Sequence, residues 1–278
     1  MPELKAIEGN GYQSKDIGAD WGKKTATRLK MWQFDGAGAW SNPAIHKYVP
    51  YGIVLGLATS YPNIADPQWE HEIEPLIQKS VQPTDINLVG YWLDNEIDWA
   101  KLYPLAEKYF DVTSRLVRKY DPNHLILGVR FNHSPPDSVL IASRGKVDAH
   151  SFNIYSDNPE DWDKEFKRAF DLAGVPSQIS EFSFYSDENT SGDLNTRGWG
   201  GRVATQTERT AKIKKTLIAW INNPLVVGAN FFQWCDEPPG GRFDEEDCNY
   251  GLVDIYDKPY SVVGIPSILV AKDVPSHK

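Results

Sequence analysis

The chain alternates between two patterns of hydrophobic and polar positions. In one, apolar residues recur every three or four positions, which is typical of a helix with one buried face; in the other, short apolar runs indicate buried strands. The first pattern predicts helices over residues 20–33, 67–80, 99–120, 137–143, 159–173, 205–222 and 262–272. The second predicts strands over residues 34–40, 49–57, 88–95, 125–131, 147–155, 177–184 and 226–234.

Strands that alternate with helices are typical of a parallel sheet, because parallel neighbours need long crossover connections. No glycine-rich nucleotide-binding fingerprint follows a predicted strand, so an open dinucleotide-binding sheet is disfavoured. We therefore predict an α/β protein with a (β/α)8 TIM barrel. Only seven strands are convincing, since the segment that would form the first, Leu4–Ile7, is short and charged. The first strand is expected to be incomplete or irregular.

One barrel domain accounts for the length. The 278 residues contain no low-complexity linker and no short internal repeat, so we expect a single domain over residues 1–278, with residues 1–19 as an irregular N-terminal segment. A missing strand exposes the edges of its two neighbours, which can then pair with other chains. The N-terminal segment can pair irregularly, a partner chain can fill the gap by self-association, or the chain can be a trimmed piece of a larger enzyme.

Composition and charge narrow the class of ligand. The net charge of −9 disfavours nucleic acid, whose binding depends on clustered Lys and Arg. No apolar run approaches the roughly 18 to 20 residues that cross a bilayer, and no signal peptide is recognised, so we predict no membrane partner. Cys235 and Cys248 are too few for a zinc site, and free thiols or one bridge both remain open. We predict no cofactor and no metal; the acidic stretch Asp244–Asp247 is interpreted as solvated, with calcium binding as the alternative.

Two glutamates at predicted strand ends are the candidates for chemistry. Glu96 follows the strand 88–95, and Glu181 lies in the strand 177–184, three strands later. Polar groups at the carboxyl ends of barrel strands face the site, and strands three places apart can face each other across the mouth. Two carboxyls so placed suit glycoside hydrolysis, in which one attacks the anomeric carbon and the other protonates the leaving oxygen. Ten tryptophans and thirteen tyrosines supply flat faces that can stack on sugar rings.

Several motifs follow one another in an order that resembles a known group of enzymes. They are RLKMWQFDGAGAWSNPA, YGIVLGL, GYWLDNEIDW, KYDPNHLILGVRF, SFNIY, ISEFSF, and FFQWCDEPPGGR with DCNYGLVDIYDKPY. Together they resemble the clan of retaining (β/α)8 glycoside hydrolases, and most closely its β-agarase and β-galactosidase-like branch. The resemblance extends over about residues 20–260.

The resemblance implies roles for individual residues. Glu181 matches the nucleophile that forms a covalent glycosyl-enzyme, and Glu96 matches the acid/base. Asn95 matches the residue that hydrogen-bonds the sugar 2-hydroxyl, and Tyr155 matches the tyrosine that holds the nucleophile ionised. Trp234 matches the sugar-stacking platform, with core packing as the alternative.

Strand parity and position place the other candidates. Asn153 shares a face with Tyr155, whereas His150 has the opposite parity and is predicted to be a core histidine. Arg130 either binds substrate or pairs with a carboxylate, and Asp94 is predicted to be a structural hydrogen-bonding group. Further candidates for substrate subsites are Trp40, Gln233, Asp236, Glu237 and Arg242.

We therefore predict a retaining glycosidase whose substrate is a β-linked, galactose-containing poly- or oligosaccharide. A β-glucan or mannan hydrolase of the same clan is the close alternative. The stretch Trp32–Gly38 departs from the family pattern, which usually reads W-G-F-N-T, and this change can alter the subsite near Trp40. Together with the doubtful first strand, it keeps open a catalytically weak or silent carbohydrate-binding barrel. The location is left open, although the family favours a secreted or periplasmic one.

Overall fold

The strands of the computed structural model, which describes residues 19–264, run parallel in two linked sheets. One sheet has the order β1-β2-β3, with bounds Tyr51–Val54, Leu88–Trp92 and Leu125–Ile126. The other has the order β4-β5-β6-β9, with bounds Arg130–Phe131, His150–Asn153, Ser177–Phe182 and Val226–Phe231. A parallel bridge from Asn95 to Arg130 joins the two sheets, and another from Ala37 to Tyr51 adds a segment beside β1. The predicted α/β class with parallel strands is confirmed.

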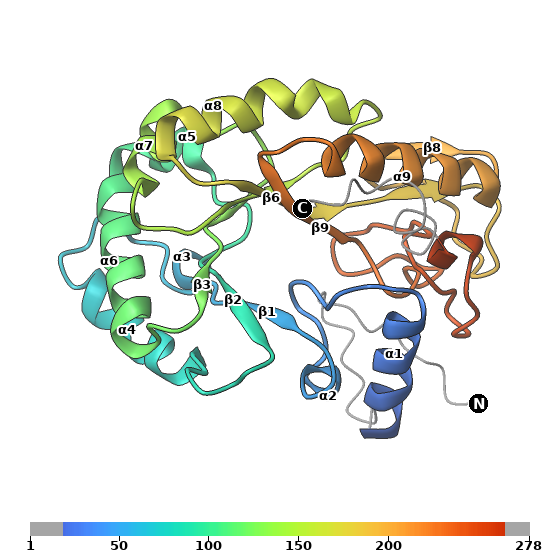
Figure 1. Cartoon of the computed structure of the whole chain (residues 1–278), viewed down its shortest axis with the longest axis horizontal. Helices are drawn as coiled ribbons and strands as arrows, with labels where there is room; N and C mark the ends of the chain where they lie inside the picture. Colours follow the sequence, from blue (N-terminus) through green and yellow to red (C-terminus); the bar gives the residue numbers. More distant parts are fainter. Residues whose placement is uncertain (1–18, 265–278) are drawn as a thin grey trace, which may run out of the picture.

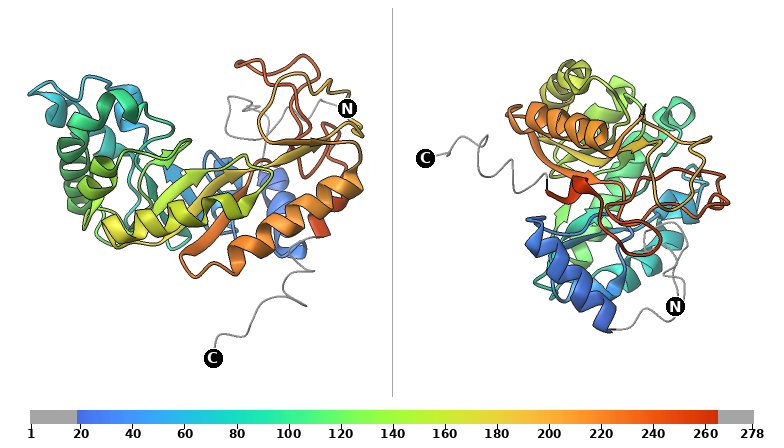
Figure 2. Two further views of the ribbon diagram at one scale, coloured as in Figure 1. Left: turned by 90° about the horizontal axis from the view of Figure 1, so that it is seen from above. Right: turned by 90° about the vertical axis from the view of Figure 1, so that its right-hand side faces the viewer.

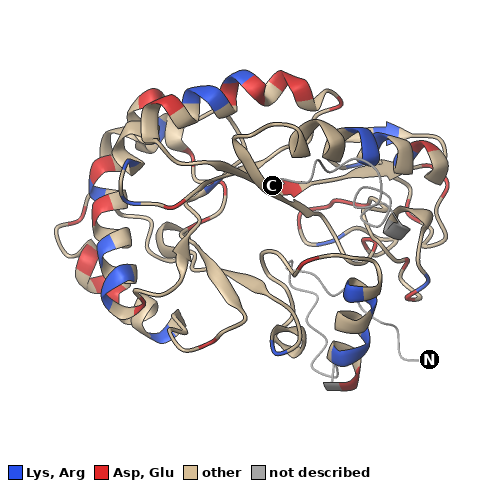
Figure 3. Ribbon diagram, in the orientation of Figure 1, with Lys and Arg blue, Asp and Glu red and all other residues tan. Residues whose placement is uncertain are grey.

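Helices cover the outside of these strands (Figure 1). The longer ones are α1 (Ala19–Met31), α4 (Trp69–Ser80), α6 (Ala106–Tyr120), α7 (Asp137–Ser143), α8 (Asp163–Ala173) and α9 (Gln206–Ile221). Short pieces are α2 (Pro43–His46), α3 (Leu57–Ser60), α5 (Trp99–Leu102), η1 (Tyr103–Leu105), η2 (Pro159–Trp162) and η3 (Ser261–Gly264). Figure 2 shows the helical layer from two further directions. Charged residues gather on the helices, whereas the enclosed strands carry few of them (Figure 3).

Side-chain and backbone chemistry explain where the elements differ from the predicted ones. The helix predicted over 99–120 is broken at η1, where Pro104 supplies no backbone N–H. The strand predicted over 125–131 is split into β3 and β4, because Gly128 turns the chain with a φ of +71°. The strand predicted over 34–40 is wrong as a continuous strand, since Ala37 alone pairs and Trp40 has a φ of +57°.

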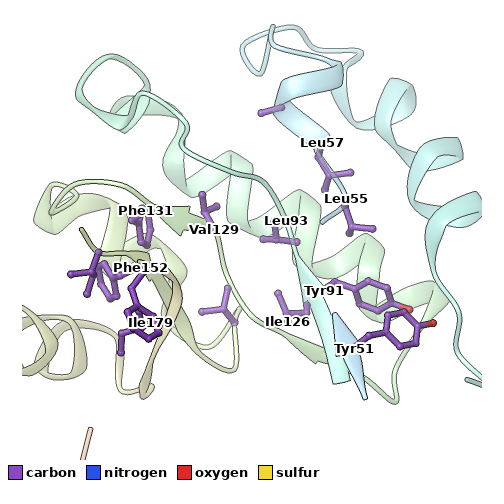
Figure 4. Packing of buried hydrophobic residues seen from close by; sticks show 14 of the residues in the cluster. Tyr51, Leu55, Leu57, Tyr91, Leu93, Ile126, Val129, Phe131, Phe152 and Ile179 are labelled. Atoms are coloured by element: carbon purple, nitrogen blue, oxygen red, sulfur yellow. The ribbon is translucent and has the colours of Figure 1, made fainter. Parts of the chain in front are cut away.

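The space between the strands and the helices is filled by one large hydrophobic cluster. Tyr91, Leu93 and Ile126 contribute from the first sheet, and Phe152 and Ile179 from the second (Figure 4). All five are at most 2% exposed. Burying an apolar side chain of this size contributes about 1.5–3 kcal/mol, so the cluster holds both sheets in one body.

One side of the arrangement has no paired strand among residues 19–264. The edge of β9 that faces away from β6 is unpaired there, and so is the outer edge of Ala37. A cavity of about 770 Å³ opens beside them. Its apolar lining includes Trp21 and Leu29 of α1 and Ile213, Leu217 and Trp220 of α9. The expected first strand at Leu4–Ile7, the N-terminal segment and most of the helix predicted over 262–272 lie outside the described residues, so a closed barrel stays a prediction.

A third, two-stranded sheet lies in the connection that follows β6. Strands β7 (Phe184–Ser186) and β8 (Gly201–Val203) pair in parallel and hold the polar segment between them against the loop that follows β9. Helix α9 begins directly after β8, where Thr205 and Glu208 form a capping box.

Candidate active site

Strand register brings the predicted polar residues together at one edge of the sheets. Asn153, the last residue of β5, pairs with Glu181 of β6. Asn95 follows β2 and bridges to Arg130, and the backbone N–H of Glu96 donates to the Arg130 carbonyl at 2.9 Å. The register of the parallel strands therefore builds the site before any side chain is considered.

Glu181 is held by two hydrogen-bond donors. The Arg130 guanidinium donates from Nη2 to Oε2 at 2.5 Å, and the Tyr155 hydroxyl donates to Oε1. Burial, the nearby Glu181 charge and the neighbouring Tyr250 raise the pKa of Tyr155 well above its ordinary value, so its phenol keeps the proton that it donates. The Arg130 side chain is 2% exposed and that of Glu181 is 12% exposed. Of the two predicted roles of Arg130, pairing with a carboxylate is confirmed.

Glu96 has a different environment. Asn153 donates from Nδ2 to Glu96 Oε1 at 2.8 Å, and Ser180 orients that amide by donating to its Oδ1 at 2.8 Å. Much of the Glu96 residue is open to solvent, yet the protein atoms around its carboxyl disfavour the charged form and raise its pKa. The Glu181 carboxylate raises this pKa further, while the Asn153 hydrogen bond lowers it.

Asn95 connects the two carboxyl groups through its side-chain oxygen. Its Oδ1 accepts from Arg130 Nη1 at 2.9 Å and from Asn153 Nδ2 at 3.2 Å. A continuous set of hydrogen bonds therefore runs from Glu96 through Asn153, Asn95 and Arg130 to Glu181. Satisfied networks of this kind fix side-chain positions.

The predicted aromatic candidates lie next to this network. Trp40, Gln233 and Trp234 line the 770 Å³ cavity together with Arg130 and Glu181. Trp40 stacks on Arg130, whose guanidinium carbon lies 4.3 Å from the ring centroid.

Trp234 combines cavity lining with core packing. It is 7% exposed and stacks on Trp32, with ring centroids 5.5 Å apart. Gln233 donates from Nε2 to Glu237 at 2.7 Å, so it also supports the loop that follows β9.

Some of the candidate subsite residues in the loop after β9 form hydrogen bonds or ion pairs with neighbouring loop residues. Asp236 is fully buried and accepts from Ser191 at 2.6 Å, Tyr260 at 2.7 Å and the Gly251 backbone at 2.8 Å. The expectation of a substrate contact from Asp236 is therefore wrong, because these donors occupy it. Glu237 forms an ion pair with Arg242 at 3.0 Å, and burial raises its pKa to about 8.

The acidic stretch Asp244–Asp247 is not uniformly solvated, contrary to the prediction. Asp247 is 7% exposed and accepts from the Thr196 backbone and hydroxyl at 2.7 and 2.6 Å. Glu246 pairs with Arg242 at 2.6 Å. Within residues 19–264, no group of three or more His, Cys, Asp or Glu side chains is arranged to hold a metal ion.

The structural roles predicted for His150 and Asp94 are confirmed. His150 is buried, contacts Ser143 Oγ at 2.8 Å, and has a pKa lowered to about 4 by burial. Asp94 is buried and accepts four hydrogen bonds. Cys235 and Cys248 are both free, which excludes the bridge. None of the described helices has the length and apolar character that a membrane span requires.

One feature of the site was missed from the sequence. Ser180 fixes the Asn153 amide, and alternation from Glu181 would have placed its side chain on the other face of a regular strand. A register shift in β6 between Ile179 and Phe182 disturbs that alternation. The polar, glycine-rich insertion over residues 187–202, by contrast, is expected from the sequence on the rim of the site, and its Gly200 packs beside Tyr155.

Two carboxyl groups in unlike environments, joined by one network, can divide acid and nucleophile roles.

Known proteins that are similar to this chain include agarases. No family model matches the chain. It is 34% identical to β-agarase B of Vibrio sp. (strain JT0107) over 185 residues, which is 63% of the chain and 18% of that protein. It is 28% identical to β-agarase A of the same organism over 282 aligned residues, 94% of the chain and 27% of that protein.

A solved structure shows the same fold. The crystal structure of an agarase, AgWH50C, matches with a TM-score of 0.77 at 24% identity, covering 91% of the chain and 49% of that protein. The chain spans less than a third of the length of the curated relatives that it matches. The predicted resemblance to the β-agarase and β-galactosidase-like branch of the glycoside hydrolases is confirmed.

Proposed function

We propose that this chain, a relative of the β-agarases, is a retaining glycoside hydrolase that cleaves β-glycosidic bonds in agarose-like, galactose-containing polysaccharides. The hydrogen-bond network that joins Glu96 to Glu181 is the observation that carries the proposal. We further propose that the parallel strands belong to one (β/α)8 barrel domain, whose wall between β9 and Ala37 is closed outside the described residues or by another chain.

In the proposed mechanism, Glu181 attacks the anomeric carbon while Glu96 transfers its proton to the departing glycosidic oxygen. The C–O bond to the leaving sugar breaks, and an ester forms between the remaining sugar and Glu181. Glu96, now ionised, then removes a proton from water, whose oxygen attacks the same carbon and releases Glu181. In this proposal the Asn95 amide donates to the sugar 2-hydroxyl, a contact that strengthens in the transition state.

The charge of Glu181 explains how Glu96 can act first as an acid and then as a base. The Glu181 charge helps to raise the pKa of Glu96, which favours the protonated acid before cleavage. Formation of the glycosyl ester removes that charge, so the pKa of Glu96 falls when the residue must act as a base. Arg130 and Tyr155 hold Glu181 in place throughout.

Two alternatives have specific support. A β-glucan or mannan hydrolase fits the same carboxyl pair, because these residues do not read the orientation of the sugar 4-hydroxyl. A silent carbohydrate-binding barrel is favoured by the altered stretch Trp32–Gly38 and by the unpaired edge of β9. Turnover on agarose, galactan, mannan and cellulose oligomers separates these substrates.

The test uses Glu181→Gln, Glu96→Gln and an exposed control, Glu72→Gln on α4. Glu181→Gln should lose at least about 10³-fold in kcat on every substrate. Glu96→Gln should lose about 10²–10⁴-fold on oligosaccharides, and less on an aryl glycoside whose leaving group needs no proton. The control should match the wild type in turnover of both substrates.

A trapping experiment identifies the nucleophile. An activated 2-fluoro glycoside should add the mass of one glycosyl group to the wild type, on the peptide that contains Glu181. Glu181→Gln should gain none. If the wild type binds the sugars but shows neither turnover nor an adduct, the chain is a carbohydrate-binding barrel without catalytic activity, and the proposed enzyme function is wrong.

A further inference from the structure

We propose that Trp199 is a sugar-binding platform at the rim of this site, where its indole face stacks on a ring of the polysaccharide beyond the cleaved bond. The inference rests on the proposed function and adds a subsite to it. Trp199 lies in the connection between β7 and β8 and is 68% exposed, although tryptophan is among the side chains with most to gain from burial.

The backbone that carries this indole is fixed. The hydroxyl of Tyr250 accepts from the Trp199 N–H at 2.5 Å and donates to the Trp199 carbonyl at 3.0 Å. Tyr250 itself is fully buried. A Cβ at Gly198 would lie 2.3 Å from Cys248 Sγ and 2.4 Å from the Tyr250 hydroxyl, so this position must be glycine. Tyr250 and the close packing of Gly198 therefore hold the backbone that carries the exposed ring.

The same segment touches the proposed nucleophile's partner. Gly200 has a φ of +94°, and a Cβ there would lie 3.2 Å from Cδ1 of Tyr155. Tyr155 donates to Glu181. Trp199 is therefore the neighbour in the chain of the residue that packs on Tyr155, and the proposal puts the next sugar of a bound chain beside it.

A second exposed ring lies on a loop tied to the first. Phe243 is 75% exposed, and the Arg242 guanidinium lies 5.9 Å from its ring and 5.2 Å from that of Phe232. Asp247 ties this loop to the Trp199 segment by accepting from the Thr196 backbone at 2.7 Å. Two exposed aromatic side chains on joined loops suit an extended ligand better than a single sugar.

The chemistry of the surface favours a neutral carbohydrate. A flat aromatic face complements the C–H face of a pyranose ring, and the two stack without a charged contact. The net charge of −9 and the acidic stretch Asp244–Asp247 on the neighbouring loop disfavour polyanions. An agarose-like chain of neutral galactose-type rings fits both properties.

The experiment measures affinity by calorimetry in the Glu181→Gln background, where bound sugars are not consumed. Trp199→Ala should weaken binding of an agarose-derived hexasaccharide about tenfold and of the disaccharide less than about twofold. Trp199→Phe, which keeps an aromatic face, should remain within about threefold for both sugars. Phe170→Ala, an exposed aromatic on the outer helix α8, is the matched control and should leave both affinities unchanged.

Each outcome decides the matter independently of turnover. A loss confined to the hexasaccharide supports the platform even if the wild type proves inactive, since binding is measured without cleavage. Equal affinities of Trp199→Ala and its parent for the hexasaccharide overturn it. An equal loss of affinity for both sugars would indicate a damaged loop and would also overturn the proposal. The proposal fails as well if the parent does not bind the hexasaccharide. The melting temperature of Trp199→Ala should match that of the parent, because the side chain is exposed.

Discussion

Asn153 is the residue through which the two proposed catalytic carboxyls communicate. It donates to both Glu96 and Asn95 and is itself oriented by Ser180. Strand parity predicted that Asn153 and Tyr155 share a face, and position at strand ends predicted Glu96 and Glu181. The Trp40 stack on Arg130 could not be predicted as a geometry, because it depends on a left-handed backbone at Trp40 that a non-glycine residue rarely adopts.

The hydrogen bond from Asn153 to Glu96 predicts the direction in which the pH profile of the rate should move when Asn153 is replaced. Asn153 donates to the ionised form of Glu96 and so lowers its pKa. Removing this donor in Asn153→Ala should raise the pKa of Glu96. Because Glu96 must be protonated to act as the acid, the alkaline limb of the kcat/KM profile should move to higher pH, while the maximal rate falls. The measurement is the pH profile of cleavage on an oligosaccharide, and a shift of this limb to lower pH would contradict the assignment.

Among the elements, the end of β2, which is followed by Asn95 and Glu96, is fixed in place by hydrogen bonds to neighbouring helices. Asp94, one residue before Asn95, accepts from the backbone of Ala58 and Thr59 in the first turn of α3 and from Tyr109 of α6. These bonds fasten the strand end to two helices. Periodicity predicted the long helices well because each buries one apolar face, but it could not find α3, which is four residues long and depends on Asp94.

Replacing Asp94 therefore tests whether its hydrogen bonds hold the end of β2 to α3 and α6. Asp94→Ala leaves two backbone N–H groups and a buried tyrosine hydroxyl without their acceptor, which should cost about 3 kcal/mol of unfolding free energy. For a chain of this size, the melting temperature should fall by roughly 5–10 °C. Activity should fall as well, since Asn95 and Glu96 follow directly.

The control for this element is Asp98→Ala, which removes an exposed carboxylate whose ion pair is with Lys101. It should leave the melting temperature nearly unchanged. Equal melting temperatures for Asp94→Ala and the wild type would show that α3 and α6 are held to the strand end by packing alone.

Taken as a whole, the molecule has one wall that its described residues do not pair. Seven strand segments were predicted, and the doubtful first one, Leu4–Ile7, lies outside the described residues; within residues 19–264, β9 and Ala37 each have one unpaired edge. The charge and short length of Leu4–Ile7 indicated from the sequence that this segment is a poor candidate for a strand. The sequence could not indicate what covers the gap, because that depends on long-range contacts or on another chain.

The open edge leads to a prediction about association. Val227 of β9 is 63% exposed and lies at this edge. Exposed strand edges pair with other chains, and a lysine on the edge disfavours such pairing. The wild type should gain mass above 31.4 kDa as its concentration rises in sedimentation velocity, and Val227→Lys should gain less.

Ile86→Lys, at a position that is 96% exposed and outside the strands, is the control and should behave as the wild type does. A wild type that stays monomeric at every concentration, or two lysine variants that associate equally, would exclude pairing through β9.

The wall that residues 19–264 leave unpaired also offers a place where an added peptide could bind. Because the cavity beside it is lined by Glu181 and Arg130 as well as by α1 and α9, a peptide that fills this cavity would lie next to the proposed nucleophile and its partner. A short apolar peptide added in solution would then act as a ligand of the folded state, raising stability in proportion to its occupancy. The catalytic rate would then depend on the concentration of the added peptide.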